Sequence, residues 1–404
     1  MIKTLKDFDF EDKLVLLRVD INSPVLNKKI IDNPRLKEAA TTIKYLLNKG
    51  AKLVILAHQG RKGDSDFIDL RQHTEHLSKY SGKEIAYFDG LFEDSALEKI
   101  DNLENGEALL MKNVRAYEDE TKIEKSRFYP FSDLFDIYVN DAFPVSHRNQ
   151  GSIMIPPKEI PSCVGLNMEK EISVLSKFDI SKNDKAIYIL GGAKIEDYFP
   201  IFNVLKNKNA KVIASGVLAN LFLVAIGNDL GYEKKWLDEK GYLESIDKLK
   251  EIYEEHKEQI ILPADFTIDG KTRKEITLEE MPSDKKIWDV GHKSVELFKK
   301  EIEGAKIVFM KGPLGYSEIE KFSYGTIEIL KKISELTKKN NIFSLLGGGH
   351  LTTAIEEYNI ENNFSHISTS GGALIAYISG EKLPGIEALE NCPSEQPYNK
   401  TIGH

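Results

Sequence analysis

The chain has 404 residues and a formal net charge of −9 at pH 7. This length is too great for one ordinary hydrophobic core and predicts two domains, which leaves room for a ligand site between them. Proteins that bind nucleic acids or membrane surfaces usually carry clustered positive charge, so the acidic balance argues against both kinds of partner.

The cysteine content and the N-terminal segment indicate the compartment. Two cysteines, Cys163 and Cys392, lie far apart and outside any metal-ligand spacing, so neither a disulfide framework nor a zinc site is predicted. The first residues, MIKTLKDFDFEDK, are charged throughout, and no apolar run has the length of a membrane span or a signal sequence. We expect a soluble cytoplasmic protein.

Short apolar runs alternate with helical segments along the chain. Strands are expected at residues 14–20, 51–58, 85–88, 107–113 and 136–141, and again at 185–192, 211–215, 259–265, 306–312 and 341–348. Continuous apolar runs separated by helices are typical of a parallel sheet that is covered on both faces. The predicted fold class is therefore α/β.

The segment before the second strand is expected to be a crossover helix. Leu36, Ala40, Ile43 and Leu47 recur at helical spacing and form one apolar face. Gly50 follows at the point where a left-handed C-terminal cap would lie.

The join between the two halves is expected near residues 155–178. Three prolines interrupt regular structure in IPPKEIPS, residues 155–162, and a helical segment, NMEKEISVLSKF, follows at 167–178. The last residues, ENCPSEQPYNKTIGH, contain too few apolar side chains to form an element alone.

Polar and mostly basic side chains follow the strands of the first half, at the edge where open parallel sheets bind ligands. They are Asp20, Asn22, His58, Arg61, Arg115, His147 and Arg148, with Arg35 just before the predicted helix. Guanidinium groups bind carboxylates and phosphates through paired hydrogen bonds, so the set predicts an anion site. For any single arginine, a solvated rim is the alternative explanation.

Glycine-rich turns follow the strands of the second half. Gly191 and Gly192 precede Lys194, and the segments GPLGYSE and LLGGGH supply further exposed backbone. Glycines that admit a phosphate, together with one ammonium group, suit phosphoryl transfer. One such pair is more often a tight turn, but three loops on one sheet favour a nucleotide. The dinucleotide fingerprint is missing because Thr352 occupies its third glycine position.

Seven motifs resemble, in order and approximate spacing, those of phosphoglycerate kinase. They are RVDINSP, HQGRKGD, YVNDAFPVSHR, LGGAKIED, GPLGYSE, LLGGGH and SHISTSGGA. The resemblance extends from about Leu14 to Gly385, and the segment HQGRKGD and the glycine loop that ends in histidine resemble the archaeal branch. The resemblance implies Mg²⁺-dependent, reversible phosphoryl transfer between ATP and 3-phosphoglycerate, giving ADP and 1,3-bisphosphoglycerate.

The resemblance also implies a domain organisation: two doubly wound, Rossmann-like parallel-sheet domains joined by a helix, with a cleft that closes by hinge bending. Residues 1–166 would bind 3-phosphoglycerate, with the tail 384–404 packing back on this domain. Residues 167–180 would form the interdomain helix, and residues 181–383 would bind the nucleotide. A monomer is expected rather than an oligomer.

Site residues are implied by the matching motifs. For 3-phosphoglycerate they are Asp20, Ile21, Asn22, Arg35, His58, Gln59, Gly60, Arg61, Arg115 and Arg148. For ATP and ADP they are Gly191, Gly192, Lys194, Glu318, Gly347, Gly348, Gly349 and His350. Lys194 and Arg35 are expected to be catalytic, Lys194 by stabilising the transferring phosphoryl group. Glu318 would hold the ribose, and Gly347 to His350 would form the triphosphate loop.

The metal is the point at which the sequence departs most from the family. Most members have an aspartate where this chain has His350, and histidine is a poor ligand for Mg²⁺. We expect the nucleotide to hold the ion chiefly, with Asp197 as the nearest matching carboxylate and His350 in contact with phosphate.

Four further positions differ from the family pattern. Tyr198 replaces a second lysine, Lys311 replaces the asparagine of NGP, His292 ends the DxGP motif, and Ser370 lies in STSGG. One hypothesis is that Lys311 supplies the charge that is lost at Tyr198.

Two alternative functions belong to other classes. One is a catalytically silent relative that binds ligand for regulation, which the retained Lys194 and arginines disfavour. The other is a nicotinamide-dependent dehydrogenase, which the missing fingerprint disfavours.

Overall fold

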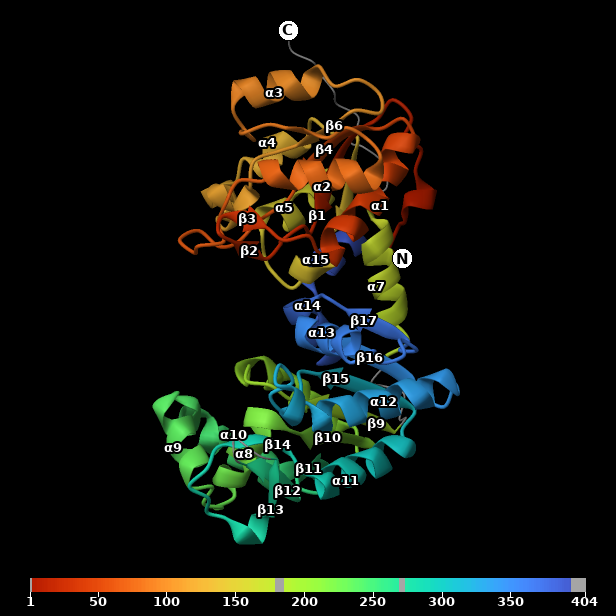
Figure 1. Cartoon of the computed structure of the whole chain (residues 1–404). Helices are drawn as coiled ribbons and strands as arrows, with labels where there is room; N and C mark the ends of the chain where they lie inside the picture. The colour runs from red at the N-terminus through yellow and green to blue at the C-terminus, as the bar shows by residue number, and fades with distance from the viewer. Residues whose placement is uncertain (1, 179–184, 269–272, 394–404) are drawn as a thin grey trace. The chain divides into compact units, whose positions relative to one another are not determined.

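The computed structural model describes residues 2–178, 185–268 and 273–393. The chain divides into two compact units, one formed by Met1–Ser176 with Lys382–His404 and the other by Lys177–Glu381. Each unit has its own parallel sheet with helices (Figure 1), so the predicted α/β class with two doubly wound sheets is confirmed. Residues 179–180 of the expected interdomain helix and residues 394–404 of the expected tail lie outside the described residues.

The sheet of unit 1 is entirely parallel. Its strands, in order across the sheet, are β5 (Ala86–Tyr87), β6 (Ala108–Leu110), β4 (Lys52–Leu56), β1 (Leu14–Val19), β7 (Ile137–Asp141) and β8 (Ser162–Val164). Val15 to Val19 are all buried, so both faces of β1 are covered. The order reverses between β1 and β7, which makes the carboxyl end of this strand pair the expected ligand position.

Helix α1 (Pro34–Asn48) has well-defined ends. The Asn33 side chain accepts a hydrogen bond from the Arg35 amide, and Pro34 occupies the first helical position. At the other end, Gly50 has a φ of +79° and its amide donates to the Leu47 carbonyl. The predicted glycine cap is therefore confirmed.

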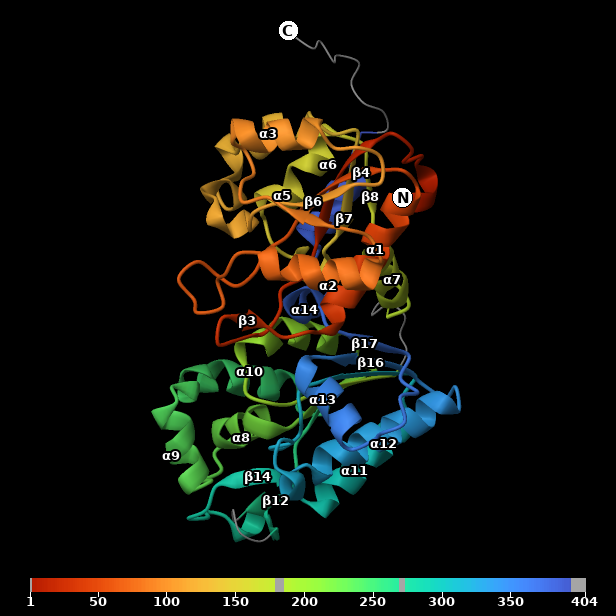
Figure 2. The same ribbon diagram turned by 45° about the horizontal axis from the view of Figure 1, so that its top comes forward.

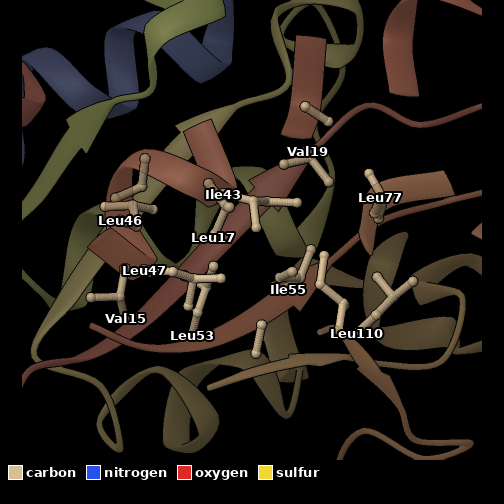
Figure 3. Packing of buried hydrophobic residues seen from close by; sticks show 14 of the residues in the cluster. Val15, Leu17, Val19, Ile43, Leu46, Leu47, Leu53, Ile55, Leu77 and Leu110 are labelled. Carbon is tan, nitrogen blue, oxygen red and sulfur yellow. The ribbon is translucent and has the colours of Figure 1, made fainter. Parts of the chain in front are cut away.

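The core of unit 1 lies between α1, α2 (Arg71–Ser81) and one face of the sheet. Figure 3 shows Val15, Leu17, Val19, Ile43, Leu46, Leu47, Leu53, Ile55, Leu77 and Leu110 in this cluster. Burying each such side chain contributes about 1.5–3 kcal/mol. The packed sheet therefore gives the loops at its carboxyl edge a rigid base.

Shorter helices complete unit 1. They are α3 (Asp94–Asp101), α4 (Phe128–Ser132), α5 (Gly151–Met154), α6 (Pro156–Glu159), α7 (Leu166–Leu175) and α15 (Pro384–Glu390), with 3₁₀ turns at Leu5–Asp7, Val114–Ala116, Glu118–Glu120, Ile123–Lys125 and Phe143–Val145. A two-stranded hairpin, β2 (Val25–Leu26) with β3 (Lys29–Ile30), precedes α1. Helix α15 packs against α5, α6 and β8.

The sheet of unit 2 is also parallel, with its first strand in the middle. The order is β11 (Ile260–Ile261), β10 (Ala210–Ala214), β9 (Ala186–Leu190), β15 (Ile307–Lys311), β16 (Phe343–Gly347) and β17 (His366–Ser368). This is the 3-2-1-4-5-6 order of dinucleotide-binding folds, and it reverses between β9 and β15.

The helices of unit 2 are α8 (Gly216–Ala225), α9 (Tyr232–Glu239), α10 (Ile246–His256), α11 (His292–Glu303), α12 (Tyr324–Lys338), α13 (Gly349–Glu357) and α14 (Gly371–Ile378), with 3₁₀ turns at Glu196–Tyr198, Pro200–Lys206, Tyr242–Ser245, Leu278–Glu280 and Glu320–Phe322. Helices α11 and α12 lie side by side in both ribbon views (Figures 1 and 2). None of the described helices combines the length and the apolar character that a bilayer crossing requires.

A second, antiparallel sheet in unit 2 was not predicted from the sequence. It consists of β13 (Lys274–Thr277), β12 (Asp265–Ile268) and β14 (Ile287–Val290). Phe266, Ile268, Ile276 and Ile287 form a small core of their own with residues before α9.

Candidate active site

The carboxyl edge of the first sheet begins with Asp20, directly after β1. Its carboxylate lies 2.9 Å from Nη1 of Arg35, at the start of α1. Asp20 is buried and Arg35 is about one quarter exposed, so the carboxylate fixes the guanidinium at the edge while leaving part of it open to solvent. The sequence prediction placed both residues at this edge.

The loop after β4 is tied to the loop after β1. Gln59 is fully buried, and its side chain accepts from the Ser23 amide at 2.8 Å and donates to the Ser23 carbonyl at 2.9 Å. Asn22 Oδ1 accepts from the Gly60 amide at 2.8 Å. Gln59 therefore holds the backbone of the loop after β1 in place. Its position in the motif did not predict this structural role.

Arg115 joins the same edge from the turn Val114–Ala116. Its Nη1 donates to the Gly60 carbonyl at 2.5 Å, and Asn113 beside it donates to the Gln59 carbonyl at 2.8 Å. Burial and the positive charges of Arg18 and Arg148 lower the pKa of Arg115 to about 10. Three separate loops are thus locked together around one cationic centre.

His58 lies at that centre. Burial first, then the charges of Arg18, Arg115, Arg35 and Arg148, hold the pKa of His58 well below its usual value. The imidazole is therefore neutral at pH 7 among guanidinium groups. Arg35, Arg115 and Arg148, which follow different strands, all contribute positive charge at this imidazole.

Three other predicted residues contribute in different ways. Arg148 Nε donates to His147 Nε2 at 3.3 Å, and the charge of Arg61 lowers the pKa of Arg148 in addition to burial. Ile21 is fully buried in the core of unit 1, so only its backbone can reach a ligand.

Sequence reasoning missed a buried network beneath His58. Arg18 is fully buried within β1, and its Nη2 lies 3.3 Å from His58 Nδ1 and 3.8 Å from Glu120. Ser152 Oγ accepts from Arg18 Nε at 2.9 Å and donates to Glu120 Oε1 at 2.9 Å. A charged residue inside an otherwise apolar strand was the signal in the sequence.

In unit 2, the turns after β9 and β15 meet at the point where the strand order reverses. The Gly191 amide donates to the Lys311 carbonyl at 2.8 Å, and the Gly192 amide donates to the Pro313 carbonyl at 2.9 Å. A Cβ on Gly191 would lie 2.2 Å from the Pro313 oxygen. Glycine at position 191 is therefore required by the close approach of two backbones.

Lys194 and Asp197 follow the first of these turns, and Lys311 directly precedes the second. Lys194 is exposed, and Lys311 Nζ lies 3.3 Å from Asp197 Oδ2. Burial lowers the pKa of Lys311, Asp197 raises it, and the charge of Lys194 lowers it again. The charge of Lys194 thus adds to burial in lowering the pKa of Lys311.

Tyr198, where the family has its second lysine, is buried and structural. Its hydroxyl donates to the Gly191 carbonyl, and it lies 3.4 Å from the Lys311 carbonyl. The ring lies 5.8 Å from Lys311 Nζ. The tyrosine thus joins the two turns and lines one side of the lysine.

The glycine loop after β16 leads directly into α13. Gly348 has a φ of +108°, which strongly favours glycine, and no atom lies within 4 Å of a Cβ on Gly348 or Gly349. His350, in the first turn, lies with Nδ1 3.0 Å from Oε1 of Glu318, and both side chains are mostly exposed. The predicted phosphate and ribose residues therefore contact each other here.

The remaining departures from the family pattern have local partners. His292 Nδ1 lies 2.6 Å from Glu275 of β13, at the start of α11. Ser370 is buried, and its amide donates to Ser368 Oγ at 3.2 Å.

Few side chains of the described residues could act as ligands of Mg²⁺. Within residues 2–178, 185–268 and 273–393, no three histidine, cysteine or carboxylate side chains gather as a metal site. Asp197 offers one half-exposed carboxylate beside the glycine turns. This fits Mg²⁺, which commonly takes one or two carboxylates and completes its shell with phosphates and water.

Comparison with known proteins decides the family. The family model of phosphoglycerate kinase matches residues 5–381. The chain belongs to the phosphoglycerate kinase family. Members of this family transfer a phosphoryl group between ATP and 3-phosphoglycerate, so the kinase prediction is confirmed, and none of the comparisons points to a dehydrogenase or a silent binder.

Relatives place the chain in the archaeal branch of phosphoglycerate kinases. It is 38% identical to the phosphoglycerate kinase of Methanopyrus kandleri, with 97% of this chain and 98% of the relative covered. It is also 38% identical to that of Pyrococcus abyssi, with 96% of this chain and 97% of the relative covered. The crystal structure of the enzyme from Pyrococcus horikoshii has a TM-score of 0.87 at 37% identity, covering 96% of this chain and 98% of that one. The predicted archaeal type is confirmed.

Proposed function

We propose that the chain transfers a phosphoryl group reversibly between ATP and 3-phosphoglycerate in the presence of Mg²⁺. The observation that carries the proposal is the arrangement of arginines at the carboxyl edge of the first sheet, where Asp20 holds Arg35 and the Gly60 carbonyl holds Arg115. A small ligand with both a phosphate and a carboxylate would match such a concentration of positive charge. Unit 1 would therefore bind 3-phosphoglycerate.

Arg35, Arg61, Arg115 and Arg148 supply the charge in this proposal. Arg18 has no acceptor atom, so His58 Nδ1 accepts from it and the imidazole proton lies on Nε2. The Nε2–H group of His58 would donate a hydrogen bond to a substrate oxygen. Asp20 holds Arg35 in place.

The nucleotide would bind at the glycine turns of unit 2. Gly347 to His350 place backbone at the N-terminus of α13, where phosphate is favoured. Asp197 would hold Mg²⁺ together with the nucleotide phosphates, and the bound ion would neutralise part of their charge. Glu318 would hold the ribose.

The chemistry needs no general base. The carboxylate of 3-phosphoglycerate is already ionised, and its oxygen forms a bond to the γ-phosphorus while the bond from that phosphorus to the ADP oxygen breaks. Lys194 would stabilise the charge on the transferring oxygens.

We also propose a monomer that works in the cytoplasm, a compartment that keeps thiols such as Cys163 and Cys392 reduced.

The decisive experiment follows ADP formation from ATP when 3-phosphoglycerate is added. ADP should form only with both substrates, chelation of Mg²⁺ should stop it, and NAD alone should produce no absorbance change. Lys194→Ala protein purified in the same way controls for contaminating kinases. A preparation that binds both ligands but forms no ADP would support the silent relative instead.

A further inference from the structure

Lys311 occupies the centre of the nucleotide edge of unit 2. It is the last residue of β15, and in the parallel register its Cα pairs with Leu190 of β9 on one side and with Gly347 of β16 on the other. Those two residues lead directly into the glycine turn before Lys194 and the glycine loop before His350. The lysine thus lies between the two phosphate-facing turns.

The Lys311 ammonium is poorly compensated in the nucleotide-free protein. Its side chain is 11% exposed, whereas its partner Asp197 is 44% exposed and lies 3.3 Å away. A contact of this length to a carboxylate in water provides little stabilisation, although burying an ammonium group is costly. The positive charge of Lys194 acts on the same group. A further anion here would be favoured.

Tyr198 limits where the ammonium can go. The tyrosine hydroxyl donates to the Gly191 carbonyl, so the ring cannot turn away without losing this hydrogen bond. The ring therefore occupies one side of the Lys311 side chain, and Asp197 lies 3.3 Å from its ammonium group.

We propose that Lys311 is a second phosphate-binding cation, which Asp197 holds in the free protein and releases when a Mg²⁺–nucleotide complex binds. This inference rests on the proposed function, because it assumes that nucleotide binds at these turns. Mg²⁺ has a strong preference for carboxylate oxygen and competes with the ammonium for Asp197. The released ammonium then pairs with a phosphate oxygen, so two positive charges reach the phosphates in one event.

Metal-free binding of ADP tests this competition by calorimetry in EDTA. Asp197→Asn should tighten metal-free ADP binding by about threefold to tenfold, because Lys311 is then free to pair with phosphate. In a Lys311→Met background the same Asp197→Asn change should give no gain. An equal gain in both backgrounds would overturn the inference, since removing a negative charge would then explain it alone.

The second test measures ADP binding by calorimetry in the presence of Mg²⁺. Lys311→Met should weaken Mg²⁺–ADP binding by about tenfold, whereas Lys311→Arg, which keeps the charge, should retain most of it. Lys211→Met is the matched control, because Lys211 on the adjacent strand β10 is also partly buried and paired with a carboxylate, Glu301, at 2.9 Å. Its affinity for ADP should be unchanged.

The two proposals fail in different ways. If the parent protein binds neither ADP nor Mg²⁺–ADP, the proposed function itself is wrong. If the parent binds Mg²⁺–ADP but Lys311→Met binds it equally well, the nucleotide site stands and only the role of Lys311 is overturned.

Discussion

Arg18 fixes the tautomer of His58. The Arg18 Nη2 group lies 3.3 Å from His58 Nδ1, and both side chains are buried. Ser152 accepts a hydrogen bond from Arg18 Nε, and Glu120 lies 3.8 Å from Arg18 Nη2. Because arginine only donates hydrogen bonds, Nδ1 must accept, and the single proton of the neutral ring lies on Nε2. The buried pair therefore presents the ring as a hydrogen-bond donor.

His58 should stay neutral across the physiological pH range. Burial and four arginines lower its pKa, so ¹⁵N NMR of labelled histidine should show an Nε2-protonated neutral ring from pH 8 to pH 6. The urea-unfolded protein is the reference, in which the ring should titrate near 6.5. Imidazolium signals from His58 at pH 6 in the folded protein would contradict this assignment.

Stability at acidic pH should depend on His73. Its Nε2 lies 3.2 Å from Gln59 Oε1, and burial lowers the pKa of His73 to about 4. In the unfolded chain His73 is therefore protonated near pH 6.5, whereas in the folded protein it is protonated only near pH 4. The free energy of unfolding should fall by roughly 3 kcal/mol over that window through this residue.

The comparison has to be made against His73→Gln at each pH. Burial raises the pKa values of Asp141 and Asp289 to about 6, so these folded-state carboxyl groups gain protons before the unfolded ones and oppose the trend. Urea unfolding at pH 7 and pH 4 should shift the stability difference by roughly 3 kcal/mol toward the glutamine variant. A constant difference would place the acid sensitivity elsewhere.

Lys194→Ala should lower kcat by at least about tenfold, equivalent to some 1.4 kcal/mol of barrier, because it removes a positive charge from the transferring phosphoryl group. Steady-state assays with both substrates saturating measure this. Lys206→Ala, at an exposed lysine that ends the turn Pro200–Lys206, should keep the parent rate. Unchanged turnover in the Lys194 variant would remove that residue from the mechanism.

Arg35→Ala should weaken 3-phosphoglycerate binding by about tenfold, since it deletes a charge-assisted contact and leaves Asp20 buried without its partner. Calorimetry on each ligand separately should show ADP affinity unaltered. Arg71→Ala removes an arginine that stacks on Tyr87 in the same unit and should affect neither ligand. Equal losses for both ligands in the Arg35 variant would mean that the ligands are assigned to the wrong units.

The metal assignment predicts a contrast between two variants. Asp197→Asn should greatly weaken the response of turnover to added Mg²⁺, because it removes the carboxylate nearest the glycine turns. His350→Asp should leave the Mg²⁺ midpoint close to that of the parent. The opposite pattern would move the ion to the glycine loop before α13.

The long parallel strands could be predicted because their buried apolar runs are continuous. The strands that the sequence prediction missed are short, or they form only because they pair with a neighbouring strand. Strand β8 has three residues and pairs with β7. Strand β13 pairs with β12 although Lys274 and Glu275 are polar. Such segments have no pattern of their own, so tertiary contacts decide their state.

The site was predictable where residues follow strand ends and unpredictable where packing assigns the role. The arginines were found because open sheets bind ligands at that edge. Arg18 was missed because it lies inside β1. Gln59 and Tyr198 contact backbone groups that are 36 and 113 residues away in the sequence, respectively. Such long-range partners leave no local signal.

Helix α15 belongs to unit 1 but is synthesised after the whole of unit 2. The Gly385 amide donates to the Ser146 carbonyl at 2.9 Å, and the helix packs against α5, α6 and β8, yet Lys177–Glu381 must be translated in between. At typical rates, unit 1 would wait roughly 10–40 s on the ribosome for its last helix. During that interval Ile153, which lies against Gly385 in the folded protein, would be uncovered. Chaperones that cover exposed apolar surface would therefore protect the nascent first unit until α15 is made.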